Sequence, residues 1–155
     1  MVRWIDGFYG GLIAGGTSVL FYAVVAVAWL HDITIGAFFA QAARTLPPFS
    51  AAPDSVPLAG LGFVMYLLVA AAFGIAYATL ARRLPSMWRA PGSVMWGLAY
   101  GLLVWWVLND LVVPVTHVIN IQPLWEGLVG TVVFYGVVLS ELTTLAHRRE
   151  AGVAP

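Results

Sequence analysis

The chain has 155 residues, of which 61% are hydrophobic and only 9% are charged. A soluble domain of this size carries about 25% charged residues and leaves a large share of its surface in water, so this composition excludes an ordinary soluble domain. The formal net charge is zero, which gives no reason to expect nucleic acid as a partner. Cysteine is absent, which excludes disulfides and thiolate chemistry.

Four apolar stretches are long enough to cross a bilayer as helices, which takes roughly 20 apolar residues. They cover about residues 7–30, 57–80, 93–113 and 124–146, and none contains an arginine. The alternation of polar and apolar residues that is typical of barrel strands is missing, so helices are expected. The sequence therefore predicts one all-α membrane domain over residues 1–155, a four-transmembrane-helix bundle of two helical hairpins.

The first stretch could also be interpreted as a signal peptide, because Ala26-Val27-Ala28 resembles a small-residue cleavage site. Two features argue against cleavage. The segment before the stretch holds Asp6 as well as Arg3, and the apolar run exceeds the usual length of about 7–15 residues. We expect this segment to remain as a membrane span.

Residues 34–46, between the first two spans, are predicted to form a short helix in the outer loop. Asp32 or Thr34 would cap its start, and Pro47-Pro48 would stop it. One apolar side and one polar side would allow it to lie in the outer headgroup region as an interfacial helix. The apolar side would hold Phe38, Phe39 and Leu46, and the polar side Gln41 and Arg44.

The arginines predict the orientation, because cytoplasmic loops carry an excess of positive residues. Arg44 would lie outside. All the others flank the predicted cytoplasmic side, namely Arg3, Arg82, Arg83, Arg89, Arg148 and Arg149. We therefore expect a multi-pass protein of the bacterial inner membrane with both termini in the cytoplasm (N-in/C-in), including a cytoplasmic tail over residues 147–155.

Small residues recur every four positions in each span and predict close helix contacts, since helices in lipid associate through small residues. The packing glycines would be Gly7, Gly11 and Gly15 in the first span, Gly74 in the second, Gly97 and Gly101 in the third and Gly136 in the fourth. A compact intramolecular bundle is one interpretation, and a homodimer through the first span is another. The similar segments 79–83 and 144–149 also raise the possibility of a duplicated hairpin.

Ionisable residues at membrane depth are functional candidates. Asp110 lies in the outer part of the third span and is a candidate proton or cation site, or alternatively an interfacial residue bonded to nearby loops. Glu141 in the fourth span could serve an ion path, reach the inner surface, or pair with Arg82 or Arg83. Glu126 falls in the first turn of the fourth helix, where the macrodipole favours a carboxylate.

His31 and His117 share the predicted outer side and are weak candidates for binding a cofactor such as haem. No HxxxH or HExxH spacing places two histidines on one helix, so no metal site is predicted. No P-loop, nucleophile elbow or dinucleotide fingerprint is present either. The sequence thus predicts no catalytic residue and no cofactor, while leaving haem or a pigment open.

The chain resembles the small four-span bacterial inner-membrane proteins of the YagU-like group. The resemblance is carried by segments 10–15, 73–77 and 97–102, by Pro114, and by Tyr135-Gly136. Members of that group often have a histidine near the last tyrosine-glycine pair, where this chain has Phe134 and Leu139. The resemblance implies a multi-pass inner-membrane protein and supplies no mechanism.

Three functional hypotheses follow. The first is a non-catalytic accessory or structural subunit of a larger bacterial membrane complex, such as a respiratory or photosynthetic one. The second is a small oligomeric proton or cation transporter or channel that uses Asp110. The third is a haem- or quinone-binding redox subunit that uses His31 and His117. The expected partners are the lipid bilayer and other membrane subunits or further copies of the chain.

Overall fold

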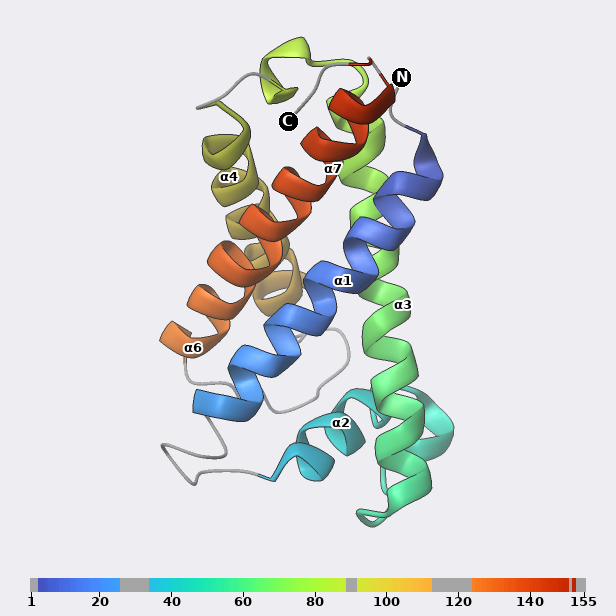
Figure 1. Cartoon of the computed structure of the whole chain (residues 1–155). Coiled ribbons are helices and arrows are strands. Elements are labelled where there is room, and N and C mark those ends of the chain that lie inside the picture. The colour runs from blue at the N-terminus through green and yellow to red at the C-terminus, as the bar shows by residue number, and fades with distance from the viewer. Residues whose placement is uncertain (1–2, 26–33, 89–91, 113–123, 151, 153–155) are drawn as a thin grey trace.

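Four helices of the computed structural model are long and apolar enough to cross a membrane. The structure describes residues 3–25, 34–88, 92–112, 124–150 and 152. The spans run over Trp4–Val25, Val56–Ala81, Gly92–Asp110 and Trp125–Arg149. The predicted all-α bundle is therefore confirmed, and Figure 1 shows the four helices packed together with a short helix between the first two.

The α-helices of the first two spans and of the loop are regular, and the first span ends in three π-helical residues, 23–25. Their bounds are α1 (Trp4–Tyr22), α2 (Ile35–Ala43) and α3 (Val56–Ala81), with a short 3-10 turn η2 (Pro47–Phe49) after α2. A second 3-10 turn, η3 (Pro85–Trp88), follows α3.

The last two spans each contain a π-helical segment. The third consists of α4 (Gly92–Trp106) and the π-helix η4 (Val107–Val112). The fourth is continuous through α6 (Leu124–Val129), the π-helix η5 (Gly130–Val137) and α7 (Val138–Glu150).

Large apolar side chains cover the outside of the bundle. Leu20 on α1 is 66% exposed and Met95 on α4 is 69% exposed, and similar residues lie along α3. Water would penalise such a surface, whereas lipid does not. Together with the four long apolar helices, this surface identifies an integral, multi-pass membrane protein in contact with the bilayer.

The two ends of the bundle differ in charge. One end, which we call the arginine end, holds the start of α1, the turn after α3 and the end of α7 (Figure 1). Its arginines in the described residues are Arg3, Arg82, Arg83, Arg148 and Arg149. The opposite end, which we call the α2 end, carries Arg44 directly after α2.

The first and second spans meet along a glycine seam formed by Gly7, Gly11 and Gly74. A methyl group added at Gly74 would lie 2.7 Å from the Cα atom of Gly11 and would also collide with the carbonyl oxygen of Gly7. Gly15 continues this contact against Ala70, where an added methyl group would lie 2.7 Å from the Ala70 Cβ atom. The helix backbones can approach this closely only because side chains are missing.

The third and fourth spans meet along a second seam of the same design, formed by Gly97, Gly101 and Gly136. A methyl group at Gly136 would lie 3.0 Å from the Cα atom of Gly101 and would collide with the carbonyl oxygen of Gly97. Each hairpin thus places one glycine of its second helix between two glycines, four residues apart, of its first helix. The glycine stripe of α1 is buried within the chain by this packing.

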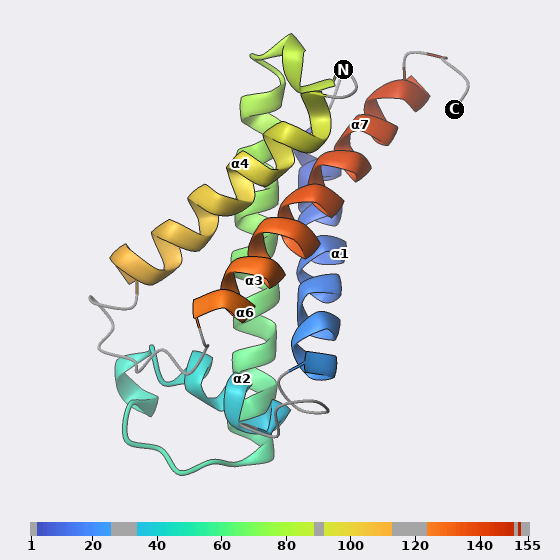
Figure 2. The same ribbon diagram turned by 90° about the vertical axis from the view of Figure 1, so that its left-hand side faces the viewer.

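The two hairpins join through α1, which contacts both α3 and the fourth span. Ser18 on α1 donates a hydrogen bond to the carbonyl oxygen of Gly130 (3.1 Å), and Thr17 donates to that of Phe134 (3.0 Å). The third span is different. It packs on the fourth span, and its α2 end diverges from α3, as Figure 2 shows.

The loop helix α2 begins as the sequence predicts at Thr34, whose side chain accepts a hydrogen bond from the Ala37 amide (3.2 Å). It packs on the α2 end of α3, where the missing side chain of Gly62 admits the backbone of Phe39. Arg44 forms an ion pair of 2.6 Å with Asp54, which ties the end of α2 to the segment that leads into α3.

Candidate functional site

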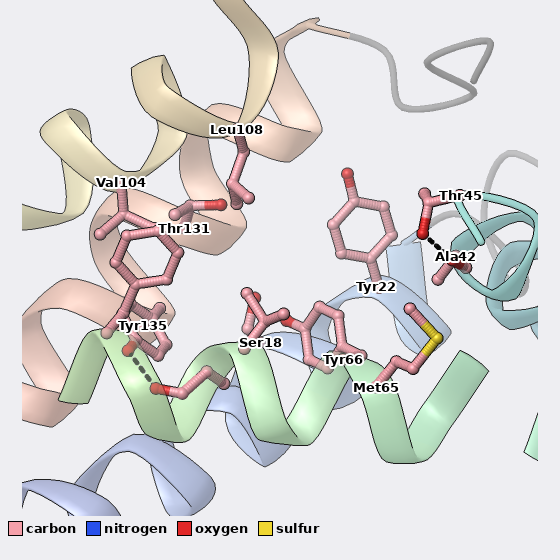
Figure 3. A pocket seen from close by; sticks show the side chains of 13 residues that line it. Ser18, Tyr22, Ala42, Thr45, Met65, Tyr66, Val104, Leu108, Thr131 and Tyr135 are labelled. Carbon is pink, nitrogen blue, oxygen red and sulfur yellow. Dashed lines mark hydrogen bonds between the residues drawn. The ribbon is translucent and has the colours of Figure 1, made fainter. Parts of the chain in front are cut away.

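A pocket of about 270 Å³ lies in the wedge where α4 diverges from α3. The second half of α1 and η5 form its back wall, and the end of α2 closes the side toward the α2 end (Figure 3). The lining residues come from every span and from the loop helix. They are Ser18, Tyr22, Ala42, Thr45, Met65, Tyr66, Val69, Ala70, Phe73, Val104, Leu108, Thr131 and Tyr135.

The helices change geometry around this pocket. Leu108 belongs to the π-helix η4, and Thr131 and Tyr135 belong to the π-helix η5. Residues 23–25, directly after Tyr22, are also π-helical, whereas α3 remains an α-helix throughout. Single π-turns within α-helices occur frequently at functional sites. Three of the four spans are therefore irregular in the part of the bundle that surrounds the pocket.

Hydroxyl groups supply the polar side chains of the lining, apart from backbone atoms. Tyr135 donates to the carbonyl oxygen of Ala70 (2.7 Å), and Ser18 donates to that of Gly130. The side chain of Tyr66 lies beside that of Ser18 (Figure 3). A hydroxyl oxygen that donates its proton still has lone pairs with which it can accept a hydrogen bond. The pocket therefore combines an apolar wall with several neutral polar atoms.

The predicted ion site at Asp110 does not belong to the pocket lining. Asp110 lies in η4, at the α2 end of the third span, and its side chain is exposed. Its neighbour Asn109 donates a hydrogen bond to the carbonyl oxygen of Trp105 (2.8 Å), one turn earlier. The location at a span end matches the sequence expectation, and its role as an ion site stays a prediction.

Glu141 lies near the arginine end, on the outside of the fourth span. Its carboxylate accepts a hydrogen bond from the hydroxyl of Ser93 at the start of α4 (3.0 Å). Within the described part of the chain, the salt bridges do not include one from Glu141 to Arg82 or Arg83, both of which are exposed. Glu141 therefore joins the third and fourth spans instead of pairing with the turn after α3.

The sequence did not indicate that Glu126 would be buried. It occupies the first turn of α6, as predicted, but its side chain is only 1% exposed. The hydroxyl of Tyr22 lies close enough to interact with it electrostatically. A single carboxylate at the start of a helix is typical of an exposed end residue, so no sequence signal indicated that other helices would cover it.

The cofactor hypothesis depends on two histidines that were predicted to share the outer side. His31 and His117 lie outside the described residues, and the cofactor hypothesis that depends on them stays a prediction. Among the residues that the structure describes, no group of three or more His, Asp or Glu side chains could hold a metal ion.

The chain was compared with known proteins at three levels. No protein family, no curated protein and no solved structure matches it. The resemblance to the YagU-like group therefore stays a prediction from sequence, and the functional argument depends on the chain's own geometry.

Proposed function

We propose that this protein is a non-catalytic accessory or scaffold subunit of a larger membrane complex in the bacterial inner membrane, with both termini in the cytoplasm. The pocket lining carries the proposal, because the thirteen lining residues that the structure describes include no carboxylate, imidazole, amine or guanidinium group. The serine, threonine and tyrosine hydroxyls of the lining would need an adjacent general base to act as nucleophiles, and the described lining supplies no such base. A pocket of this composition suits binding or structural support better than chemistry.

The helix packing favours a rigid bundle over one in which groups of helices move against each other. Both glycine seams bring helix backbones into contact, and the hydroxyls of Tyr135 and Tyr100 bond to carbonyl oxygens of α3. Alternating access needs one group of helices to rock against another. Such motion would have to break the close contact between α1 and α3 or these bonds across the bundle. The transporter hypothesis therefore gains less support than the subunit hypothesis.

The proposal can be tested by photocrosslinking in native membranes. A photoreactive amino acid would be placed, one position at a time, at Ile13 on α1, Leu68 on α3 and Leu102 on α4, which are all exposed and apolar. A subunit should crosslink to one defined protein from one of these faces and copurify with it in a fixed ratio, while the other faces label lipid. Purification as a lone monomer with lipid adducts at all three positions would contradict the proposal. Crosslinks only to a second copy would replace it with a homo-oligomer.

The transporter hypothesis has its own test. Asp110→Asn and the unchanged protein would be reconstituted in liposomes, and proton and cation flux would be measured. A flux that depends on Asp110 would favour transport over the subunit proposal, whereas equal or absent flux in both would remove the transporter hypothesis.

A further inference from the structure

The pocket is reached most directly from lipid. It occupies the wedge between α3 and the diverging end of α4, which Figure 2 shows from the side. Val69 lines it from α3 and is still 43% exposed, so it stands at the rim on the outer surface of the bundle. Ala42 and Thr45 cover the pocket toward the α2 end. A molecule dissolved in the hydrocarbon could therefore enter between α3 and α4 without crossing the headgroup layer.

The lining selects against charge and against large molecules. Burying an ionised group without a partner costs several kcal/mol or more, and none of the lining side chains that the structure describes carries a countercharge. The volume of about 270 Å³ is close to the lower end of ligand pockets, which starts at roughly 300 Å³. That space suits one substituted ring and is too small for a porphyrin. The occupant is therefore neutral and ring-sized.

Aromatic rings and hydroxyl groups surround the space. Tyr22, Tyr66, Phe73 and Tyr135 contribute rings to the wall. Planar rings prefer offset or edge-on contacts with such side chains, and these contacts add stability beyond the burial of apolar area. Hydroxyls such as that of Thr131 can bond to oxygen atoms on a ligand ring. A saturated acyl chain would use neither feature.

We propose that this pocket binds the ring of a neutral, lipid-soluble quinone, with the apolar tail of the quinone leaving toward lipid between α3 and α4. The described lining residues would hold the ring, whatever the role of His31 and His117. The inference also goes beyond the subunit proposal, because it depends only on the pocket and would hold for a protein that works alone.

A photoaffinity probe tests the proposal. Purified full-length protein in lipid nanodiscs would be irradiated with an azido derivative of decylubiquinone, and labelled residues would be mapped by mass spectrometry. Labels should concentrate on residues 65–73 of α3 and residues 104–108 of the third span, and an excess of decylubiquinone should reduce them at least five-fold. Labelling spread over the exposed surface, without competition, would overturn the proposal.

Two matched variants on α3 make the test specific. Val69→Trp would place an indole at the pocket rim, and Val64→Trp makes the same change at a position that is 53% exposed and does not line the pocket. The part of the labelling that excess decylubiquinone removes should fall at least five-fold in Val69→Trp and stay unchanged in Val64→Trp. Equal labelling in the two variants would contradict the proposal that the quinone ring binds in this pocket.

A lipid tail is the main rival occupant. A phospholipid with a photoreactive acyl chain would be incorporated in the same nanodiscs. If it labels the pocket residues and excess decylubiquinone does not displace it, an acyl chain fills the pocket and the quinone proposal is wrong. Displacement by decylubiquinone would support the proposal.

Discussion

The hydroxyl of Tyr135 in the fourth span donates a hydrogen bond of 2.7 Å to the carbonyl oxygen of Ala70 in the second span. The two spans belong to different hairpins, so this bond joins the hairpins directly. The Ala70 carbonyl lies beside the first glycine seam, where Gly11 approaches the same backbone. A single phenol thus joins the pocket wall to the helix packing behind it (Figure 3).

Removing this bond should weaken the contact between the hairpins. We expect Tyr135→Phe to lower the free energy of unfolding by about 1 kcal/mol, because a hydrogen bond inside a membrane protein contributes roughly 0.5–2 kcal/mol. Thermal unfolding in detergent would measure the loss. Tyr9→Phe is the control, since the Tyr9 side chain on α1 is 58% exposed. If the two variants unfold alike, the bond does not contribute to stability.

The first glycine seam should not tolerate a methyl group. We expect Gly74→Ala to destabilise the protein by about 1–3 kcal/mol, because the new methyl group would overlap the backbone of Gly11. Gly60→Ala on the same helix is the control, since an added methyl group there meets nothing within 4 Å. The control should be neutral or slightly stabilising, because alanine favours the helix over glycine. Unfolding midpoints of the two variants, measured in the same detergent, would give the difference in stability. Equal midpoints would contradict the close backbone contact at Gly74.

The second seam should respond in the same way as the first. Gly136→Ala is expected to cost a similar amount, about 1–3 kcal/mol, because its methyl group would press on the backbone of Gly101. Gly16→Ala on α1 provides the matched control, because it also meets open space. If Gly136→Ala is neutral while Gly74→Ala destabilises the protein, the helices of the second hairpin are not packed in the same way as those of the first.

The start of the loop helix depends on Thr34. Thr34→Ala removes the side chain that accepts the Ala37 amide, and such a cap contributes about 1 kcal/mol. Amide hydrogen exchange at residues 35–38 should therefore become roughly five-fold faster, while exchange in α3 stays unchanged. Ser50→Ala, in the exposed turn after α2, should leave α2 exchange as it is. Unaltered exchange in Thr34→Ala would mean that packing on α3 alone holds the helix.

The sequence predicted the spans well because length and hydropathy determine them. The second span was expected over 57–80 and runs over Val56–Ala81, and Thr34 caps the loop helix as anticipated. The span ends differ by a few residues because they depend on capping and turns rather than on hydropathy.

The sequence could not predict how the spans are arranged. Every span has a face of small residues, so the spacing of these residues does not reveal which helices meet. It does not show that α1 contacts both α3 and the fourth span, or that the end of the third span diverges from α3. The burial of Glu126 and the pocket both depend on that arrangement. Predictions at Asp110 and Glu141 relied on local position, which does not indicate the partner that a neighbouring helix supplies.

Membrane orientation is the most direct test of the central claim, that four helices cross lipid and leave both ends of the chain on one side. Since the chain has no cysteine, Ser50→Cys, Ser86→Cys and Gly152→Cys each provide a single thiol. Under the proposed orientation in a bacterial inner membrane, a membrane-impermeant maleimide that crosses the outer membrane should label Ser50→Cys in intact cells. The other two variants should react only once the inner membrane is permeabilised. Labelling of Ser50→Cys and Ser86→Cys from the same side would contradict the account.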